Sequence, residues 1–182
     1  MRLIAVMMTL TLVAEPAAAQ TPAESPEVVA ERYVSAMRTQ KWSVMADLMH
    51  PEALAKFRTM FSGVVHSPGA GPVREQLFGG ATPARLDSLS DAQFYALVIA
   101  VAMSADPELQ TAMDSARLEI LGHVDEGSDM SHVVFRMRLP VGPVTVAKLD
   151  VITFKRYRNT WLTLLRADLE IMAAALQQRF GT

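Results

Sequence analysis

In the second half of this 182-residue chain, apolar and polar residues alternate at every second position. The alternation begins near Ser115 and continues to Ala167, and short turns rich in Asp, Gly, Pro and Asn interrupt it. Successive side chains of a β-strand point to opposite faces, so this pattern predicts strands with one apolar and one polar face. Turns this short allow only antiparallel pairing, because parallel strands need a long crossover. We therefore expect a four-stranded antiparallel meander, with strands near residues 115–124, 132–139, 144–157 and 160–167.

The first half instead has apolar residues at three- and four-residue spacing, which is typical of amphipathic helices. Ser25-Pro26-Glu27 indicates a helix start, because serine caps free backbone N–H groups and proline suits the first helical turn. His50-Pro51 ends a second helix, since the residue before a proline is pushed out of the helical region. The Pro- and Gly-rich stretch Ser67–Pro83 is either a lid or a connector, and we interpret it as a connector. The expected helices run from Pro26 through Met37, over Lys41–Met49, over Ala53–Val65, over Phe94–Met103 with a cap at Ser90-Asp91, over Pro107–Met113, and from Asp168 to near Phe180.

These two halves together predict the fold class. An amphipathic sheet must bury its apolar face, and the preceding helices are the available cover. We therefore expect an α+β fold in which the N-terminal helices pack on one face of a curved four-stranded antiparallel meander, followed by a C-terminal helix. The length suits one domain, which we place at residues 26–182.

The start of the chain has the features of a cleavable secretion signal. Arg2 gives a positive start, an apolar run follows from Leu3 to Val13, and Ala17-Ala18-Ala19 forms a small-residue cleavage motif. The run is shorter than the ~20 residues that span a bilayer. A buried N-terminal helix would also be apolar, but the proline-rich sequence after the run argues against it. We expect a signal peptide at residues 1–19, cleavage between Ala19 and Gln20, a disordered tail at residues 20–25, and a periplasmic or secreted mature protein.

Composition narrows the classes of partner and cofactor. The net charge is −2, whereas nucleic-acid binders carry a clustered positive surplus, so we expect no nucleic-acid partner. The absence of cysteine excludes disulfides, thiolate metal sites and a lipid anchor at a cysteine. No H-x-x-x-H, H-E-x-x-H, G-x-S-x-G or phosphate-loop pattern occurs. We therefore expect no metal, no cofactor, and no membrane anchor once the signal is removed.

Three sequence features give the chain a family resemblance. They are the opening helix with Tyr33-Val34-Ser35-Ala36-Met37, the break at Trp42, and a closing hairpin from Val151 to Trp161 in which a polar turn separates a strand from tryptophan. With these features, the stretch Glu24–Asp168 resembles the NTF2-like superfamily of cone-shaped α+β domains. That superfamily contains steroid isomerases, polyketide cyclases, dehydratases, transport factors and non-catalytic domains, so the resemblance does not select a function. It implies an apolar cavity inside the cone and self-association through the outer face of the sheet.

Lys148 and Asp150 are the candidate charges for catalysis and ligand binding. They lie on the same face of the third predicted strand as residues that are typical of a core. If that face lines the cone, burial would raise the pKa of Asp150, as a general base requires. If the odd-numbered residues such as Leu149 face inward instead, the two charges form a solvated surface pair.

Aromatic residues supply the other candidate ligand contacts. Tyr33, Trp42 and Tyr95 have the spacing of core residues, and some could also line an apolar pocket. Asp47 and His50 lie three residues apart, either as an acid–base pair on one helical face or as a plain helix end with a histidine. The polar face of the first two strands is either an anion-binding patch or a solvated face with cross-strand pairs. It comprises Arg117, Glu119, His123, His132, Arg136 and Arg138.

The leading hypothesis from the sequence is an exported, non-enzymatic domain that binds a small apolar or anionic molecule, or a partner protein. Its candidate ligand-binding residues are Tyr33, Trp42, Tyr95 and Lys148. The alternative is a cofactor-independent isomerase, cyclase or dehydratase that uses Asp150 as general base. The two differ visibly, because catalysis needs a polar residue inside an open cavity. A homodimer formed through the sheet is a third expectation.

Overall fold

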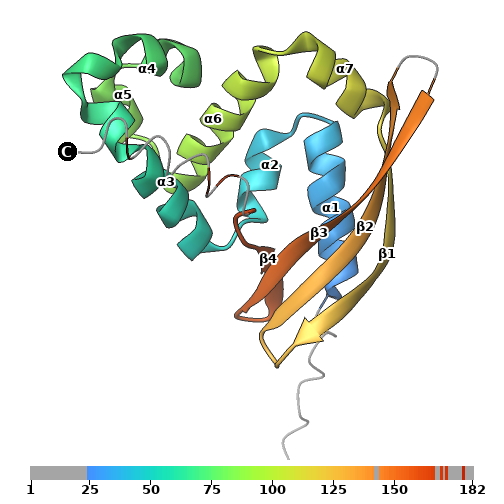
Figure 1. The fold of residues 1–182 in the computed structure, drawn as a ribbon. Coiled ribbons are helices and arrows are strands. Elements are labelled where there is room, and N and C mark those ends of the chain that lie inside the picture. Colours follow the sequence, from blue (N-terminus) through green and yellow to red (C-terminus); the bar gives the residue numbers. More distant parts are fainter. Residues whose placement is uncertain (1–23, 142–143, 167–168, 170, 172–177, 179–182) are drawn as a thin grey trace, which may run out of the picture.

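The computed structural model describes residues 24–141, 144–166, 169, 171 and 178. Within them the chain forms seven α-helices and then a four-stranded antiparallel sheet, which confirms the α+β class (Figure 1). The predicted signal peptide lies outside the described residues, and so does most of the predicted C-terminal helix. No described helix has both the length and the apolar character needed to cross a bilayer. The helices are α1 (Pro26–Arg38), α2 (Trp42–Asp47), α3 (Pro51–His66), α4 (Gly71–Phe78), α5 (Pro83–Asp87), α6 (Asp91–Ser104) and α7 (Pro107–Ser115).

Short polar side chains begin several of these helices. The Ser25 hydroxyl accepts a hydrogen bond from the Val28 N–H at the start of α1, and Thr82 caps α5 in the same way. At the start of α6, Ser90 and Gln93 each accept a hydrogen bond from the other's backbone N–H. These caps satisfy N–H groups that have no partner inside the helix, and they confirm the helix starts predicted at Ser25 and Ser90.

The stretch Ser67–Pro83 is mostly helical, so the prediction of a connector there is wrong. Pro68–Ala70 form one turn of 3-10 helix, and α4 follows directly from Gly71. Proline at the start of a helix does not break it, because N–H groups of the first turn have no helical partner in any case. The Phe78 ring at the end of α4 is buried, which ties this segment to the core, and Gly79 ends the helix with a left-handed φ of 58°.

The four strands pair in sequence order, which confirms the predicted meander. The last strand is shorter than predicted, because the Thr163 backbone binds the segment between α2 and α3. Its N–H donates to the Leu48 carbonyl (2.9 Å), and its carbonyl accepts from the His50 N–H (2.8 Å). The strands are β1 (Arg117–Glu126), β2 (Met130–Val141), β3 (Val144–Tyr157) and β4 (Thr160–Thr163).

A β-bulge in β1 changes which side chains face the helices. The pairing register shifts between Ile120 and Gly122, and Gly122 has a φ of 141°, which residues with side chains rarely adopt. Beyond the bulge His123 lies opposite the buried Val133, whereas Val124 is on the outer face and is 62% exposed. The prediction that His123 belongs to the polar outer face of the first two strands is therefore wrong, because one extra residue reverses the alternation.

The inner face of the sheet is covered mainly by α1 and α7. Helix α1 contacts β1, β2 and β4, and α7 contacts β2 (Figure 1). The expectation of helices packed on one face of the sheet is thus fulfilled by two helices and not by all of them. The buried side chains of the inner face are Val133, Phe135, Ile152, Phe154 and Trp161.

The remaining helices form a second layer beside the sheet. Helix α6 contacts α2, α3 and α4, and α5 packs on α3 (Figure 1). Aromatic rings fill the space between them, with centroids 4.8 to 6.2 Å apart in tilted and edge-to-face arrangements. These rings belong to Phe57, Phe61, Phe78, Phe94 and Tyr95.

Candidate functional site

Asp150 lies on the inner face of β3. It is opposite the buried Phe135 in the register of β2 and β3, and its side chain is 19% exposed. Its Oδ2 accepts hydrogen bonds from Arg166 (2.9 Å) and Lys148 (3.3 Å), and its Oδ1 accepts one from the Val151 N–H (2.9 Å). The sequence allows Asp150 to face either the interior or the solvent, and in the structure it faces the interior. The positive charges of Arg166 and Lys148 compensate its negative charge.

The pKa of Asp150 lies below that of an ordinary aspartate. Burial acts to raise this pKa, but the hydrogen bonds from Arg166, Val151 and Lys148 and the positive charge of Arg166 outweigh burial. The expectation of a raised pKa is wrong, because it considers burial without a partner for the charge. Asp150 is ionised at neutral pH, and a carboxylate of low pKa is a weak proton acceptor.

Arg166 is the residue of this cluster that sequence reasoning misses. The alternation places it inside a fourth strand, but β4 ends at Thr163, and Arg166 lies beyond that end and reaches back to β3. The one available signal is a lone cation that follows the stretch Trp161–Leu165, which is apolar except for Thr163. A charged side chain next to such a run needs a partner, although the sequence does not say which one.

Tyr33 on α1 and Tyr95 on α6 are buried close to Arg166. The Tyr95 side chain is among the most enclosed in the protein, with 2% of the residue exposed. Burial, and then the neighbouring hydrogen-bonded Tyr33 hydroxyl, raise the pKa of Tyr95, while the charge of Arg166 acts in the opposite direction. The Tyr95 hydroxyl is therefore protonated at neutral pH. Arg166 thus lies beside two predicted site residues, Asp150 and Tyr95. Lys148 contacts Asp150, and Tyr33 contacts Tyr95.

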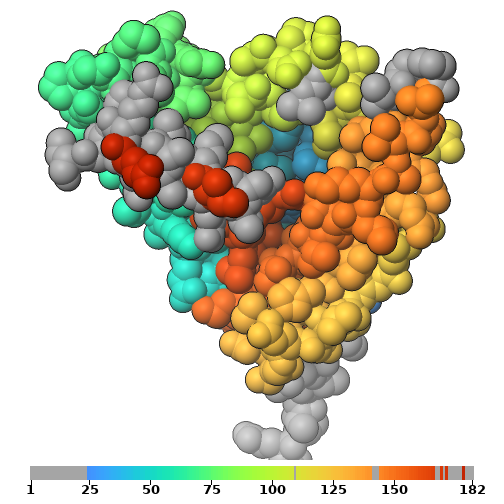
Figure 2. Space-filling model, viewed as in Figure 1, coloured from blue at the N-terminus to red at the C-terminus, as the bar shows by residue number. Residues whose placement is uncertain are grey.

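A pocket of about 420 Å³ opens at this cluster, along β3 beyond the end of β4. The space-filling view shows a hollow between β3 and helices α6 and α7, with α1 visible at the bottom; these helices contribute no lining residue to the pocket at Asp150 (Figure 2). Two cations and one carboxylate line the pocket, so its charged residues carry one net positive charge, and leucines supply apolar wall. The main lining residues are Lys148, Asp150, Val151, Leu164, Leu165 and Arg166.

Trp42 is separate from this pocket. It begins α2, is half-buried, and packs against the hydrophobic core. Its side chain is not among those that line the pocket at Asp150. Tyr33 and Tyr95 do not line it either, so only two of the five predicted site residues, Lys148 and Asp150, lie in the pocket wall.

Asp47 and His50 do not share a helix. Helix α2 ends at Asp47, and His50 begins the next helix, where its Nδ1 accepts a hydrogen bond from the Glu52 N–H (3.2 Å). Burial lowers the pKa of His50, which agrees with a neutral ring acting as acceptor at a helix N-terminus. Asp47 lines another cleft, of about 590 Å³, between α2 and α6. The interpretation of an acid–base pair on one helical face is therefore wrong. The alternative of a histidine that ends the helix is wrong as well, because His50 begins α3.

The polar face of β1 and β2 carries cross-strand ion pairs. Arg136 and Arg138 both donate to Oε2 of Glu119, at 3.1 and 3.0 Å, and His132 lies 2.8 Å from Glu126. These contacts fit the interpretation of a solvated face stabilised by pairs. Among the described residues, no three His, Asp or Glu side chains converge in a way that could hold a metal ion.

Comparisons with family models, with curated proteins and with solved structures find no match for this chain. The class of the protein is therefore defined by its own architecture. It is an α+β protein with a meander sheet, a helix-covered inner face, and a charged pocket along the third strand.

Proposed function

We propose that the protein is an exported domain of the NTF2-like superfamily that binds a small anionic molecule with an apolar part and catalyses no reaction. Export is proposed from the signal-like sequence of residues 1–19. Membership of the superfamily is proposed from the resemblance of residues 24–168. The four-stranded meander with α1 against its inner face is compatible with that resemblance.

The observation that carries the binding function is the arrangement of charges at Asp150. This carboxylate accepts hydrogen bonds from both Arg166 and Lys148, so it neutralises one of the two cations. The Lys148 side chain is 60% exposed, and an ammonium group has three donors, so donors remain available at the mouth of the pocket. An incoming carboxylate can bind there while its apolar part contacts Leu164 and Leu165.

The enzymatic alternative makes Asp150 the general base of a cofactor-independent isomerase, cyclase or dehydratase. A base that works at neutral pH needs a pKa near that pH. The cluster around Asp150 shifts its pKa the other way, because Arg166 and Lys148 favour the ionised form more than burial disfavours it. Binding without catalysis is therefore the function that the geometry supports better.

Isothermal titration calorimetry with octanoate tests this proposal, with octanol and octylamine as ligands of equal length and different charge. We expect octanoate to bind more tightly than the other two. Lys148→Gln should weaken octanoate binding by about tenfold, which is the effect of losing ~1.4 kcal/mol from a charge-assisted hydrogen bond. Lys41→Gln changes an exposed lysine outside the pocket, so this matched control should leave the affinity unchanged. Equal binding of octanoate and octanol would contradict the proposal.

A further inference from the structure

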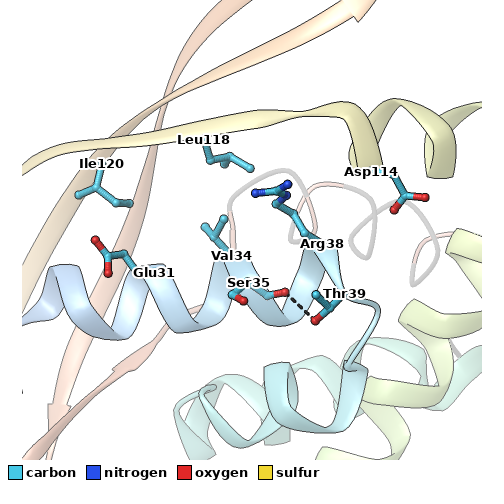
Figure 3. A pocket seen from close by; sticks show the side chains of 8 residues that line it. All are labelled: Glu31, Val34, Ser35, Arg38, Thr39, Asp114, Leu118 and Ile120. Carbon is cyan, nitrogen blue, oxygen red and sulfur yellow. Dashed lines mark hydrogen bonds between the residues drawn. The ribbon is translucent and has the colours of Figure 1, made fainter.

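A third cleft, of about 480 Å³, lies between α1 and the start of β1, with the end of α7 at one side (Figure 3). It shares no lining residue with the pocket at Asp150. Three of its side chains come from one row of α1, namely Glu31, Val34 and Arg38. Leu118 and Ile120 of β1 form the facing wall (Figure 3).

The cleft has an acidic end, an apolar middle and a basic end. Glu31, Val34 and Arg38 occupy helix positions i, i+3 and i+7, which lie on one side of an α-helix. Seven residues advance a helix by about 10 Å, at roughly 1.5 Å per residue. Glu31 and Arg38 are therefore held at opposite ends of the cleft, with Val34 between them.

The two charged ends have no partner within the described part of the chain. Neither Glu31 nor Arg38 makes a side-chain hydrogen bond or an ion pair there. The other two charged residues of the same helix before Arg38, Glu27 and Arg32, are each ion-paired with a residue outside the helix. The unpaired charges of α1 are thus the ones that line the cleft.

We propose that this cleft binds a zwitterionic molecule with an ammonium group at one end, a carboxylate at the other, and an apolar spine between them. The ammonium group lies at Glu31. The carboxylate lies at Arg38, whose guanidinium can donate two parallel hydrogen bonds to it. An extended spine of about eight carbons spans the same ~10 Å as the two side chains, given carbon–carbon bonds of about 1.5 Å. ω-Amino acids and short peptides with free ends belong to this chemical class.

Asp114 adds a second negative charge to the cleft, and this charge disfavours a ligand that carries only a carboxylate. It lies on α7 at the Arg38 end of the cleft, so the charged lining residues carry one net negative charge (Figure 3). A ligand with only a carboxylate is repelled by that net charge, and a ligand with only an ammonium group leaves Arg38 without a partner. A molecule with both charges satisfies both ends.

The affinities of ω-amino acids of increasing length test the distance between the two charged ends of this cleft. Calorimetric titrations use 4-aminobutanoate, 6-aminohexanoate, 8-aminooctanoate and 12-aminododecanoate, in the Lys148→Gln background so that the pocket at Asp150 contributes little. We expect the tightest binding for 8-aminooctanoate, and affinities on the order of tenfold lower for octylamine and for octanoate, which each lack one charge. Affinity that rises steadily with chain length, or equal binding of 8-aminooctanoate and octylamine, would overturn the proposal.

Substitutions of the two ends give an independent test. Arg38→Gln and Glu31→Gln should each lower the affinity for 8-aminooctanoate on the order of tenfold and remove the length optimum. Both residues are exposed, so the variants should keep the fold, which circular dichroism checks. Arg32→Gln is the matched control, because Arg32 lies on the same helix outside the cleft, and it should bind as the parent does. An equal loss in Arg32→Gln and Arg38→Gln would refute the site. Failure of octanoate to bind at Asp150 would leave this result unaffected.

Discussion

Arg58→Ala is expected to destabilise the helical layer by about 3 kcal/mol. Arg58 joins α3 to the start of α6. Its Nε donates to the Asp91 carboxylate, and its two other nitrogens donate to the backbone carbonyls of Leu86 and Leu89. The guanidinium carbon also lies 4.8 Å from the centroid of the Phe94 ring. One side chain thus holds the turn before α6 and the first part of that helix.

The magnitude follows from these four contacts. The hydrogen bonds to two backbone carbonyls contribute about 1 kcal/mol each. The side chains of Arg58 and Asp91 are 27% and 41% exposed, so solvent screens their ion pair, which we set at no more than about 1 kcal/mol. The contact with Phe94 adds about 0.5 kcal/mol, as for a cation over a ring near the surface. For a protein of this size, about 3 kcal/mol lowers Tm by about 6 to 12 °C.

Thermal and urea unfolding followed by circular dichroism measure this loss. Arg85→Ala is the matched control, because Arg85 is an exposed arginine of the neighbouring α5 and makes no ion pair within the described residues. We expect that control to change the free energy of unfolding by less than about 0.5 kcal/mol. A loss in Arg58→Ala no larger than that of Arg85→Ala would refute the reasoning.

Other single-residue changes test the pocket, the core and the contact between α1 and β1. Asp150→Asn removes the negative charge of the pocket, so octanoate should bind more tightly in calorimetry, whereas weaker binding would contradict the proposed site. Ser131→Ala removes a buried hydroxyl without a hydrogen-bond partner in the described structure, so urea unfolding should show equal stability or a gain of up to about 1 kcal/mol; a clear loss would reveal a partner. The hydrogen bond with Glu27 raises the pKa of His123 against opposing burial, and the charges of Glu27 and Asp125 reinforce it. A raised histidine pKa gives stability that is complete below the ordinary value of about 6.5 and is lost as pH rises through the folded value. The Tm advantage of the parent over His123→Gln should therefore shrink as the pH rises above about 6.5, and a constant difference would exclude this coupling.

Much of the sheet can be predicted from sequence, because β2 and the second half of β3 bury one face against helices. Phe135 and Phe154 are buried where the alternation places them. The bulge in β1 is harder to predict from the sequence, because a single inserted residue leaves the overall pattern of apolar residues nearly intact. The isolated Gly122 inside a strand pattern is the one signal that marks it. Without that signal, Val124 and His123 are assigned to the wrong faces.

The candidate site can be predicted only in part. The period of two allows an inward orientation for Lys148 and Asp150, but it does not decide between the two faces. The partner Arg166 comes from a segment with its own strand-like pattern, and a pairing between segments depends on how the chain folds back. The contact between Tyr33 and Tyr95 depends in the same way on how α1 and α6 pack.

The short strand β4 has a consequence for how the chain acquires its structure. It pairs with β3 on one side, and on the other side its Thr163 backbone binds Leu48 and His50, which precede most of the helices. The helical layer and the sheet therefore cannot separate without breaking these bonds, and we expect heat to melt both in a single cooperative event. During synthesis on the ribosome, the segment between α2 and α3 can therefore form these bonds only after Thr163 has emerged.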